Sequence, residues 1–310
     1  MSERIILVDC DEPELNAELC AILQQTPGVT VVLPGSADAI QARYACCWQP
    51  DPLLLQHSPA LKLVQAASAG VDHLPEAVFA SDVALCRVVD DNFRHGMYEY
   101  ALWGVLWFQR HFNRAISNQS QKIWKIYPQR QAASYHIGVM GLGEIGGYIA
   151  VQLSQLGYQV SGWSRNAKPL PGVKTYAGEA QAGDFLQTLD VLINLLPLTE
   201  QTRGILAKPL LDKLPTGAAL INCGRGEHMV NLDVLEALNS GQLAGAVLDV
   251  FPVEPLEPSD PLWTHPAVVI TPHMASSAPA EVIIQQLLEN IQRIEAGIAI
   301  NNQVDKARGY

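Results

Sequence analysis

The sequence predicts an α/β protein with two domains built on parallel sheets, and three observations support that prediction. Short β-rich apolar runs alternate with amphipathic helical segments along the chain. The alternation stops in a polar stretch at residues 119–134 and then restarts, which indicates two separate units. The length of 310 residues also suits two domains better than one or three.

The first third of the chain contains the first set of predicted strands, at residues 4–8, 30–33, 44–48, 63–66 and 83–87. A helix is expected over residues 13–24, because Leu15, Leu19 and Leu23 fall on one helical face. Residues 98–118 are rich in Leu, Trp and Phe at helical spacing. We expect them to form a long helix that connects the two domains.

The second set of predicted strands follows the polar stretch, at residues 136–140, 159–163, 191–194, 218–222, 246–250 and 268–271. Helices are expected between them, at residues 144–156, 208–214 and 232–240. A final amphipathic helix at residues 280–296 is expected to return to the first domain. The predicted domains are therefore residues 1–97 together with 278–310, and residues 98–277.

Charge and composition argue against several classes of function. A net charge of −11 argues against nucleic-acid binding, which usually needs a basic surface. The N-terminus reaches Asp9 and Asp11 too soon for a secretory signal, and no apolar run is long enough to span a membrane. The six cysteines form no C-x-x-C pair or metal-ligand spacing. We therefore expect a cytoplasmic protein with reduced thiols, no metal site, no membrane contact and no nucleic-acid partner.

A glycine-rich loop lies between the predicted strand at 136–140 and the helix that follows it. Its residues are Gly141, Leu142, Gly143, Glu144, Ile145 and Gly146, which form a G-x-G-x-x-G motif. The first glycine allows a tight turn, the second lets a pyrophosphate approach the backbone, and the third lets the helix pack on the strand. The helix N-terminus favours phosphate groups. The motif predicts a dinucleotide site, and the alternative is a glycine-rich turn without a ligand.

The end of the next strand indicates which dinucleotide is preferred. An NAD enzyme usually has an acidic residue there to bind the ribose hydroxyls. This chain has Ser164, Arg165 and Lys168 instead, which suit the 2′-phosphate of NADP(H). We predict that NADP(H) is preferred and that NAD(H) is still accepted, with a solvated basic turn as the alternative.

Three later residues predict the chemistry, because each follows a predicted strand. Arg225 offers a fork of donors to a carboxylate and its neighbouring carbonyl. His273 suits the proton that must reach the oxygen when a ketone is reduced, and Glu254 beside it would orient the ring. Taken singly, each residue has a structural alternative: a surface arginine, a turn glutamate and a core histidine.

The order of the motifs resembles the D-isomer-specific 2-hydroxyacid dehydrogenase family. G-x-G-x-x-G at Gly141 is followed by N-x-x-R-G at Asn222, D-V-F-x-x-E-P at Asp249 and T-P-H at Thr271. The resemblance implies two Rossmann-like domains with parallel sheets and the active site in the cleft between them. Residues 1–97 and 278–310 would form a discontinuous substrate or lid domain, and residues 98–277 the dinucleotide-binding domain.

The resemblance also implies roles for individual residues. Arg225 would bind and polarise the substrate, His273 would be the acid/base, and Glu254 would be its carboxylate partner. Asp249 and the carbonyl of Cys223 would hold the nicotinamide carboxamide. The remaining implied contacts are with the cofactor at Leu196, Pro197 and Thr202, and with the substrate carboxylate at Ala69 and Gly70.

Within the family, residues 163–165 and 303–310 resemble the glyoxylate/hydroxypyruvate reductase A group. That resemblance implies NADPH-dependent reduction of glyoxylate and hydroxypyruvate to D-2-hydroxy acids by a homodimer. Trp48 would be an aromatic wall for a small substrate, or else a core tryptophan that ends a strand. Gly224 departs from the family, which usually has Ala before the catalytic arginine.

Three alternatives remain open at this point. The same chemistry would serve a larger 2-oxo acid or another family substrate. A non-catalytic protein that senses dinucleotides would keep the same fold. A third alternative is that Cys223, which would lie beside the nicotinamide, acts as a thiol nucleophile. Arg225, Glu254 and His273, however, form a complete set of residues for hydride transfer without it.

Overall fold

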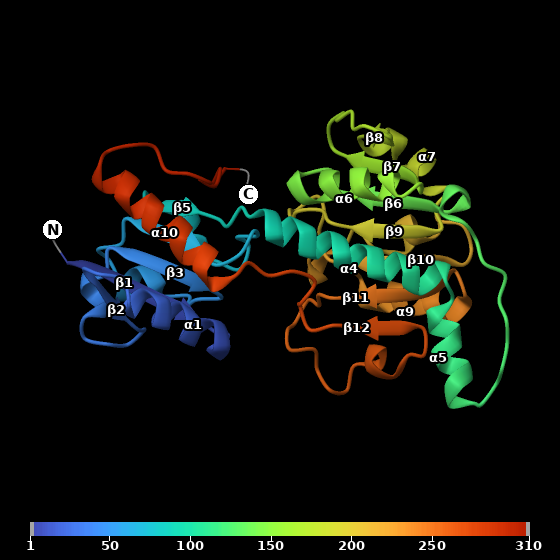
Figure 1. The fold of residues 1–310 in the computed structure, drawn as a ribbon, viewed down its shortest axis with the longest axis horizontal. Helices are drawn as coiled ribbons and strands as arrows, with labels where there is room; N and C mark the ends of the chain where they lie inside the picture. Colours follow the sequence, from blue (N-terminus) through green and yellow to red (C-terminus); the bar gives the residue numbers. More distant parts are fainter. Residues whose placement is uncertain (1–2, 308–310) are drawn as a thin grey trace. The chain divides into compact units, whose positions relative to one another are not determined.

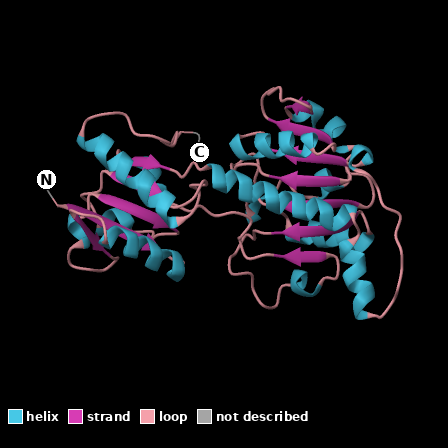
Figure 2. Cartoon of the chain, viewed as in Figure 1, coloured by secondary structure: helices cyan, strands magenta, loops and turns pink. Residues whose placement is uncertain are grey.

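The computed structural model describes residues 3–307, and its contacts divide the chain into two units. Unit 1 comprises Met1–Phe93 with Ser277–Tyr310, and unit 2 comprises Arg94–Ser276. Both contain a parallel sheet with helices packed beside it (Figures 1 and 2). The α/β fold predicted from the sequence is thereby confirmed. The resemblance noted for residues 303–310 includes residues 308–310, which lie outside the described part of the chain.

The described part of unit 1 forms a five-stranded parallel sheet in the order β2-β1-β3-β4-β5. Its strands are β1 (Arg4–Cys10), β2 (Val29–Val32), β3 (Tyr44–Trp48), β4 (Leu63–Ala66) and β5 (Ala84–Cys86). Its helices are α1 (Pro13–Gln24), α2 (Leu54–His57), α3 (Glu76–Ala80) and α10 (Ala280–Glu295). α1 and α10 lie against each other.

Apolar side chains alternate between the two faces of this sheet, so both faces are buried. Ile6 and Val8 pack in a cluster that includes Leu19 of α1 and Ile283 of α10. Leu7 between them packs on the opposite face, in a second cluster with helix α2 and Val304. The vicinal pair Cys46 and Cys47 divides in the same way and is fully buried. Both cysteines therefore behave as small core residues.

The C-terminal segment of the chain is tied into unit 1 beyond α10. Its residue Lys306 donates from Nζ to the carbonyl oxygens of Val78 at 2.8 Å, Ser81 at 2.8 Å and Val83 at 2.6 Å. An ammonium group has three donors, and all three are used here. These hydrogen bonds attach the segment after α10 to α3 and to the residues that lead from α3 into β5.

Unit 2, all of whose residues are described, forms a seven-stranded parallel sheet in the order β12-β11-β10-β9-β6-β7-β8. Its strands are β6 (His136–Met140), β7 (Gln159–Ser164), β8 (Val173–Ala177), β9 (Val191–Asn194), β10 (Ala218–Asn222), β11 (Leu243–Leu248) and β12 (Val268–Ile270). The helices are α4 (Asp91–Gln109, which starts in unit 1), α5 (Phe112–Ser120), α6 (Glu144–Gln155), α7 (Ala182–Leu186), α8 (Lys208–Leu211) and α9 (Asn231–Ser240). The strand order reverses between β6 and β9, and ligands of doubly wound sheets bind at such a point.

Helices cover both faces of the second sheet (Figure 1). α4 crosses one face so closely that a Cβ atom on Gly104 would lie 2.7 Å from the side chain of Ile221 in β10. Leu220, the preceding residue of that strand, belongs to the cluster formed with α7, α8 and α9. The carboxyl ends of all seven strands lie at one edge, because every pair is parallel.

Several element predictions are wrong in this unit. The single helix expected over residues 98–118 is two helices, because His111 adopts a left-handed backbone conformation (φ 57°) between α4 and α5. The first of them, α4, also begins earlier than predicted, at Asp91. The sequence does not predict β8, an edge strand in which every residue is at least partly exposed. β11 ends at Leu248, whereas the sequence predicts a strand over residues 246–250.

Candidate functional site

The glycine loop joins β6 to α6, and its three glycines differ in their surroundings. Gly141 has a φ of 97°, and a Cβ atom on it would lie 2.6 Å from the carbonyl oxygen of Leu195. A Cβ atom on Gly146 would lie 1.9 Å from the carbonyl oxygen of Gly141. Nothing lies within 4 Å of a Cβ atom placed on Gly143, the N-cap of α6. The loop is therefore tight everywhere except at the helix N-terminus, where open space suits a pyrophosphate.

The basic residues predicted to bind the cofactor follow the neighbouring strand β7. Lys168 donates from Nζ to the carbonyl oxygen of Leu142 at 2.7 Å, which brings its ammonium group to the glycine loop. The hydroxyl of Ser164 donates to the carbonyl oxygen of Asn166 at 2.7 Å, and Arg165 is exposed. No carboxylate stands between Ser164 and Lys168. This strand end therefore presents positive charge where NAD enzymes present an acid.

A second loop at the same edge follows β9, beside β6. Leu195 donates its N–H to the carbonyl oxygen of Met140 at 2.8 Å, which joins the loop to the end of β6. Leu196 is buried, and Thr202 closes the loop by donating from Oγ1 to the carbonyl oxygen of Pro197 at 2.7 Å. The loop that carries the predicted cofactor-lining residues Leu196, Pro197 and Thr202 thus begins beside the glycine loop.

His273 and Glu254 form a hydrogen-bonded pair. Nδ1 of His273 lies 2.8 Å from Oε2 of Glu254, and the N–H of Phe251 donates to Oε1 at 2.8 Å. Burial raises the pKa of the Glu254 carboxyl, but these two hydrogen bonds and the charges of His273 and Arg225 outweigh burial and lower its pKa overall. Because Glu254 accepts from Nδ1, proton transfer to a substrate is left to Nε2.

Asp249 fixes the loop that carries His273. Its buried carboxylate accepts hydrogen bonds from Oγ1 of Thr271 at 2.6 Å and from the N–H groups of Met274 at 2.9 Å and Ala275 at 3.0 Å. Its carbonyl oxygen accepts the N–H of His273 at 2.8 Å. These bonds hold His273 in a left-handed conformation (φ 51°), which non-glycine residues seldom adopt. The predicted contact of Asp249 with nicotinamide remains a prediction.

Tyr100 of α4 is a further part of this arrangement, and its contact with Thr271 was not predicted from the sequence. Thr271 uses its hydroxyl proton on Asp249, so Tyr100 of α4 must donate to Thr271 across their 2.5 Å contact. Burial raises the pKa of the Tyr100 hydroxyl, which keeps the proton that this bond needs. The only sequence signal was the position of Tyr100 near the start of a long helix.

Arg225 follows β10 and has a local backbone contact. Its Nη1 donates to the carbonyl oxygen of Gly224 at 2.8 Å, and its charge acts on Glu254. Cys223, two residues earlier, is buried, and burial raises the pKa of its thiol well above the ordinary value. A neutral thiol is a poor nucleophile, so this environment argues against the alternative in which Cys223 attacks the substrate.

Three predicted substrate residues lie in unit 1. Trp48 ends β3 and contacts the ring of His73, with 4.4 Å between the ring centroids. Ala69 and Gly70 are in the loop after β4, where the Ser68 hydroxyl donates to the Gly70 carbonyl oxygen at 2.7 Å. Both are partly buried. Their roles in substrate binding stay predictions.

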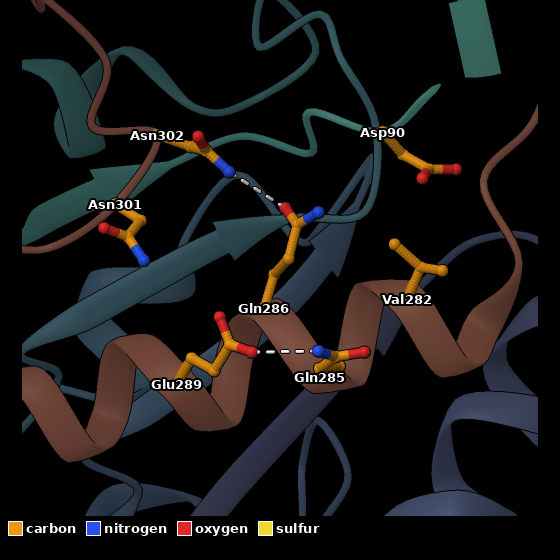
Figure 3. A pocket seen from close by; sticks show the side chains of 7 residues that line it. All are labelled: Asp90, Val282, Gln285, Gln286, Glu289, Asn301 and Asn302. Atoms are coloured by element: carbon orange, nitrogen blue, oxygen red, sulfur yellow. Dashed lines mark hydrogen bonds between the residues drawn. The ribbon is translucent and has the colours of Figure 1, made fainter. Parts of the chain in front are cut away.

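Unit 1 also contains a cavity of about 410 Å³ between α10 and the segment that follows it (Figure 3). Its lining comprises Asp90, Val282, Gln285, Gln286, Glu289, Asn301 and Asn302. Amides and two carboxylates line it, with no positive charge, so it does not suit an anionic substrate or phosphate. Within residues 3–307 there is no cluster of side chains suited to a metal ion, and no helix has the length and apolarity needed to cross a membrane.

Comparison with known proteins connects this arrangement to one family. The family model described as D-isomer specific 2-hydroxyacid dehydrogenase, NAD binding domain, matches residues 102–275. A Salmonella paratyphi B protein named glyoxylate/hydroxypyruvate reductase A is 42% identical over 277 residues, which cover 87% of this chain and 88% of that protein.

Two solved structures are similar over nearly the whole chain. A D-isomer specific 2-hydroxyacid dehydrogenase family protein from Klebsiella pneumoniae is 66% identical with a TM-score of 0.97, and 99% of each chain is covered. An NADPH-dependent glyoxylate/hydroxypyruvate reductase from Sinorhizobium meliloti, solved with NADP and sulfate, is 35% identical with a TM-score of 0.90. That match covers 99% of this chain and 100% of the other.

Proposed function

Because the chain belongs to the D-isomer specific 2-hydroxyacid dehydrogenase family, we propose that it uses NADPH to reduce glyoxylate and hydroxypyruvate to D-2-hydroxy acids. The chain is an oxidoreductase by this membership, and the names of its relatives support the reaction class. The observation that carries the proposal is the 2.8 Å pair of His273 Nδ1 and Glu254 Oε2. Reduction of a ketone needs a proton donor, which a histidine oriented by a carboxylate can supply, whereas binding a dinucleotide needs none.

NADP(H) is the preferred cofactor, with NAD(H) as an alternative. The S. meliloti relative is named as NADPH-dependent and was solved with NADP. The residues present fit this cofactor, because Gly143 leaves open space at the N-terminus of α6 and Lys168 approaches the glycine loop. Ser164 and Arg165 would bind the 2′-phosphate, and Leu196, Pro197 and Thr202 would line the cofactor.

In the proposed reaction the cofactor supplies the hydride, and three residues each have one task. When bound, NADPH supplies the hydride that goes to C2 of the 2-oxo acid. Arg225 binds the substrate carboxylate and draws electron density toward the carbonyl oxygen. His273 delivers a proton from Nε2 to that oxygen, so the C=O group becomes CH–OH. Glu254 orients the imidazole through Nδ1 and stabilises its charged form.

The other predicted contacts belong to this proposal. Asp249 and the carbonyl of Cys223 would hold the nicotinamide carboxamide. The N–H groups of Ala69 and Gly70 would bind the substrate carboxylate, and Trp48 would limit the size of the substrate. We also propose a homodimer that works in the cytoplasm, where the cysteine thiols, free wherever they are described, would stay reduced.

The test is turnover of the purified protein with a matrix of cofactors and acids. Loss of reduced-nicotinamide absorbance is measured for NADPH and NADH, each with glyoxylate, hydroxypyruvate, pyruvate and a branched 2-oxo acid. We expect rapid oxidation of NADPH with the two small acids, and a loss of about 10²–10⁴-fold in kcat in His273→Ala.

The outcomes separate the alternatives. Faster turnover with the branched acid would move the function to a larger substrate. Tight dinucleotide binding without turnover of any acid would favour a non-catalytic sensor. If His273→Ala left the chemical step unchanged, His273 would not be the proton donor.

A further inference from the structure

A group of fully buried polar side chains contacts the backbone next to Arg225. They are Asn194 at the end of β9, Asn222 at the end of β10 and His228 just after Arg225, each 0% exposed. Burying such groups is costly unless they are hydrogen-bonded. Here they bond to one another: Nδ2 of Asn194 donates to Oδ1 of Asn222 and to Nδ1 of His228, both at 2.9 Å.

This group fixes the backbone on both sides of Arg225. The N–H of Gly224 donates to Oδ1 of Asn222 at 3.2 Å, and Nδ2 of Asn222 donates to the carbonyl oxygen of Arg225 at 3.2 Å. The N–H of Arg225 itself donates to Nδ1 of His228 at 3.0 Å. The guanidinium group is thus attached to a backbone segment held by three hydrogen bonds to buried side chains.

The pattern of donors determines which ring nitrogen of His228 carries the proton. The Arg225 N–H and the Asn194 amide both point at Nδ1, and neither can accept. Nδ1 must therefore be unprotonated, and the proton is on Nε2. Nε2 lies 3.3 Å from the carbonyl oxygen of Pro197, to which it donates. One imidazole thus contacts the Arg225 backbone on one side and the loop after β9 on the other.

We propose that His228 is a positioning residue that aligns the substrate-binding Arg225 through Nδ1 and the cofactor-lining loop through Nε2. This inference rests on the proposed function, in which Arg225 binds the oxo acid and Pro197 lines the cofactor. His228 touches neither ligand, and it acts through the two backbone segments. The ring is packed tightly on its Nδ1 side, where a Cβ atom on Gly224 would lie 2.8 Å from Nδ1 of His228 and 2.7 Å from Nδ2 of Asn194.

Two substitutions separate the two contacts. In His228→Asn, the side-chain oxygen takes the place of Nδ1 as acceptor, and the donor to Pro197 is lost. In His228→Gln, the terminal amide takes the place of Nε2 as donor, and the acceptor for the Arg225 N–H is lost. A merely structural histidine would respond to both changes in the same way, whereas a residue with two separate tasks would not.

We expect the two variants to differ in which constant changes. His228→Asn should raise the Kd for NADPH by about fivefold and leave kcat/KM for glyoxylate, at saturating NADPH, nearly unchanged. The effect is small because the Pro197 carbonyl keeps its bond from Thr202. His228→Gln should lower kcat/KM for glyoxylate by about 20-fold, with NADPH binding nearly unchanged, because the Arg225 N–H loses its acceptor.

His265 provides a matched control in the same unit. Its Nδ1 also accepts a backbone N–H, that of Ala267 at 3.2 Å, but it precedes β12 and so lies at the amino edge of the sheet. His265→Asn and His265→Gln should leave both constants unchanged. NADPH binding is measured by fluorescence and does not depend on turnover. Equal losses of both constants in the two His228 variants would overturn the proposal.

A measurement on the unaltered protein covers the case in which the variants do not fold. The ¹⁵N chemical shifts of His228 should identify a neutral ring with its proton on Nε2. A proton on Nδ1 would overturn the proposal. Failure of the proposed function looks different, because the wild-type protein would then turn over no oxo acid, or Arg225→Gln would leave its turnover unchanged.

Discussion

Glu254 is held by two donors, the imidazole of His273 and the N–H of Phe251, and both favour its ionised form. The carboxyl therefore has a pKa below that of an ordinary glutamate, although partial burial acts in the opposite direction. The consequence for the neighbouring histidine is a fixed orientation that does not depend on pH across the neutral range. Glu254 itself stays ionised near neutral pH, so it does not make activity depend on pH in that range.

This lowered pKa predicts how stability depends on pH. Because the folded-state pKa lies below the ordinary value of 4.5, the ionised form stabilises the fold fully above that pH. The stabilisation is lost as the pH falls through the folded-state pKa. Urea unfolding of wild type and Glu254→Gln should show a difference in free energy of unfolding that is present at about pH 6 and shrinks as the pH falls below about 4. A difference that grows on acidification would contradict the assignment.

Arg165 is the residue whose replacement should separate the two cofactors. It lies in the basic turn after β7, and only NADPH carries the 2′-phosphate that it would bind. Arg165→Ala should raise KM for NADPH by about tenfold or more and change KM for NADH by less than about twofold. Lys213→Ala, which removes an exposed charge after α8, is the control. Equal losses with both cofactors would remove the 2′-phosphate assignment.

At the site, the sequence predicted which residues follow the strand ends but not what holds them there. The pairing of Glu254 with His273 was predicted from their types and order, and in the structure Nδ1 of His273 lies 2.8 Å from Oε2 of Glu254. The network of Asn194, Asn222 and His228 was not predicted. These residues match no ligand spacing, and their hydrogen bonds join segments that are distant in the chain. Such contacts can be seen only once the strand order is known.

At the scale of elements, we predict that two glycines of the turn between β6 and α6 have different roles, one in stability and the other in cofactor binding. Gly146→Ala would put a methyl group 1.9 Å from the Gly141 carbonyl oxygen, so it should lower the melting temperature by several degrees. Gly143→Ala meets nothing within 4 Å, so the fold should keep its stability. The methyl group would instead occupy the space left for the pyrophosphate and weaken NADPH binding by about tenfold or more.

Thermal melting and fluorescence titration of both variants check this pair of expectations. The contrast matters more than either value alone, because each variant serves as the control for the other. Unchanged NADPH binding in Gly143→Ala would mean that the cofactor does not approach this turn. An unchanged melting temperature in Gly146→Ala would mean that the loop and helix can separate at little cost.

Elements with a clear hydrophobic period were predicted well. α1, β3, β4, β6, β9 and β10 have the bounds that the sequence indicates. β8 was missed because an edge strand buries little and shows no strong apolar run. The break at His111 was missed because no glycine or proline marks it, and the left-handed residue is a histidine.

At the scale of the whole molecule, unit 2 has a group of exposed apolar side chains that would suit a contact with another protein chain. α5 and the segment after it carry Phe112, Ile116, Ile123, Trp124 and Ile126, which are 48%, 54%, 48%, 95% and 85% exposed. Several large apolar side chains exposed within one short stretch of chain are typical of a protein interface. We therefore expect this surface to form the contact of the proposed homodimer.

The double variant Trp124→Ser and Ile126→Ser tests this expectation. Light scattering after size exclusion should give the mass of a dimer for wild type and that of a monomer for the variant, because an interface depends on a few aromatic and aliphatic anchors. Ile298→Ser removes a comparably exposed side chain from unit 1 and should leave the mass unchanged. A wild-type protein that is monomeric, or a double variant that stays dimeric, would contradict the assignment.

The return of α10 to unit 1 has a consequence for biosynthesis. Ile283, Ile284, Leu287 and Ile291 belong to the same buried cluster as β1, so the N-terminal sheet lacks part of its cover until they have been translated. Residues 94–276 are complete before any of them leaves the ribosome. A released fragment that ends at residue 276 should therefore resist proteolysis in its newer part, residues 94–276, and be cleaved in its older one. The segment made first is the one that folds last.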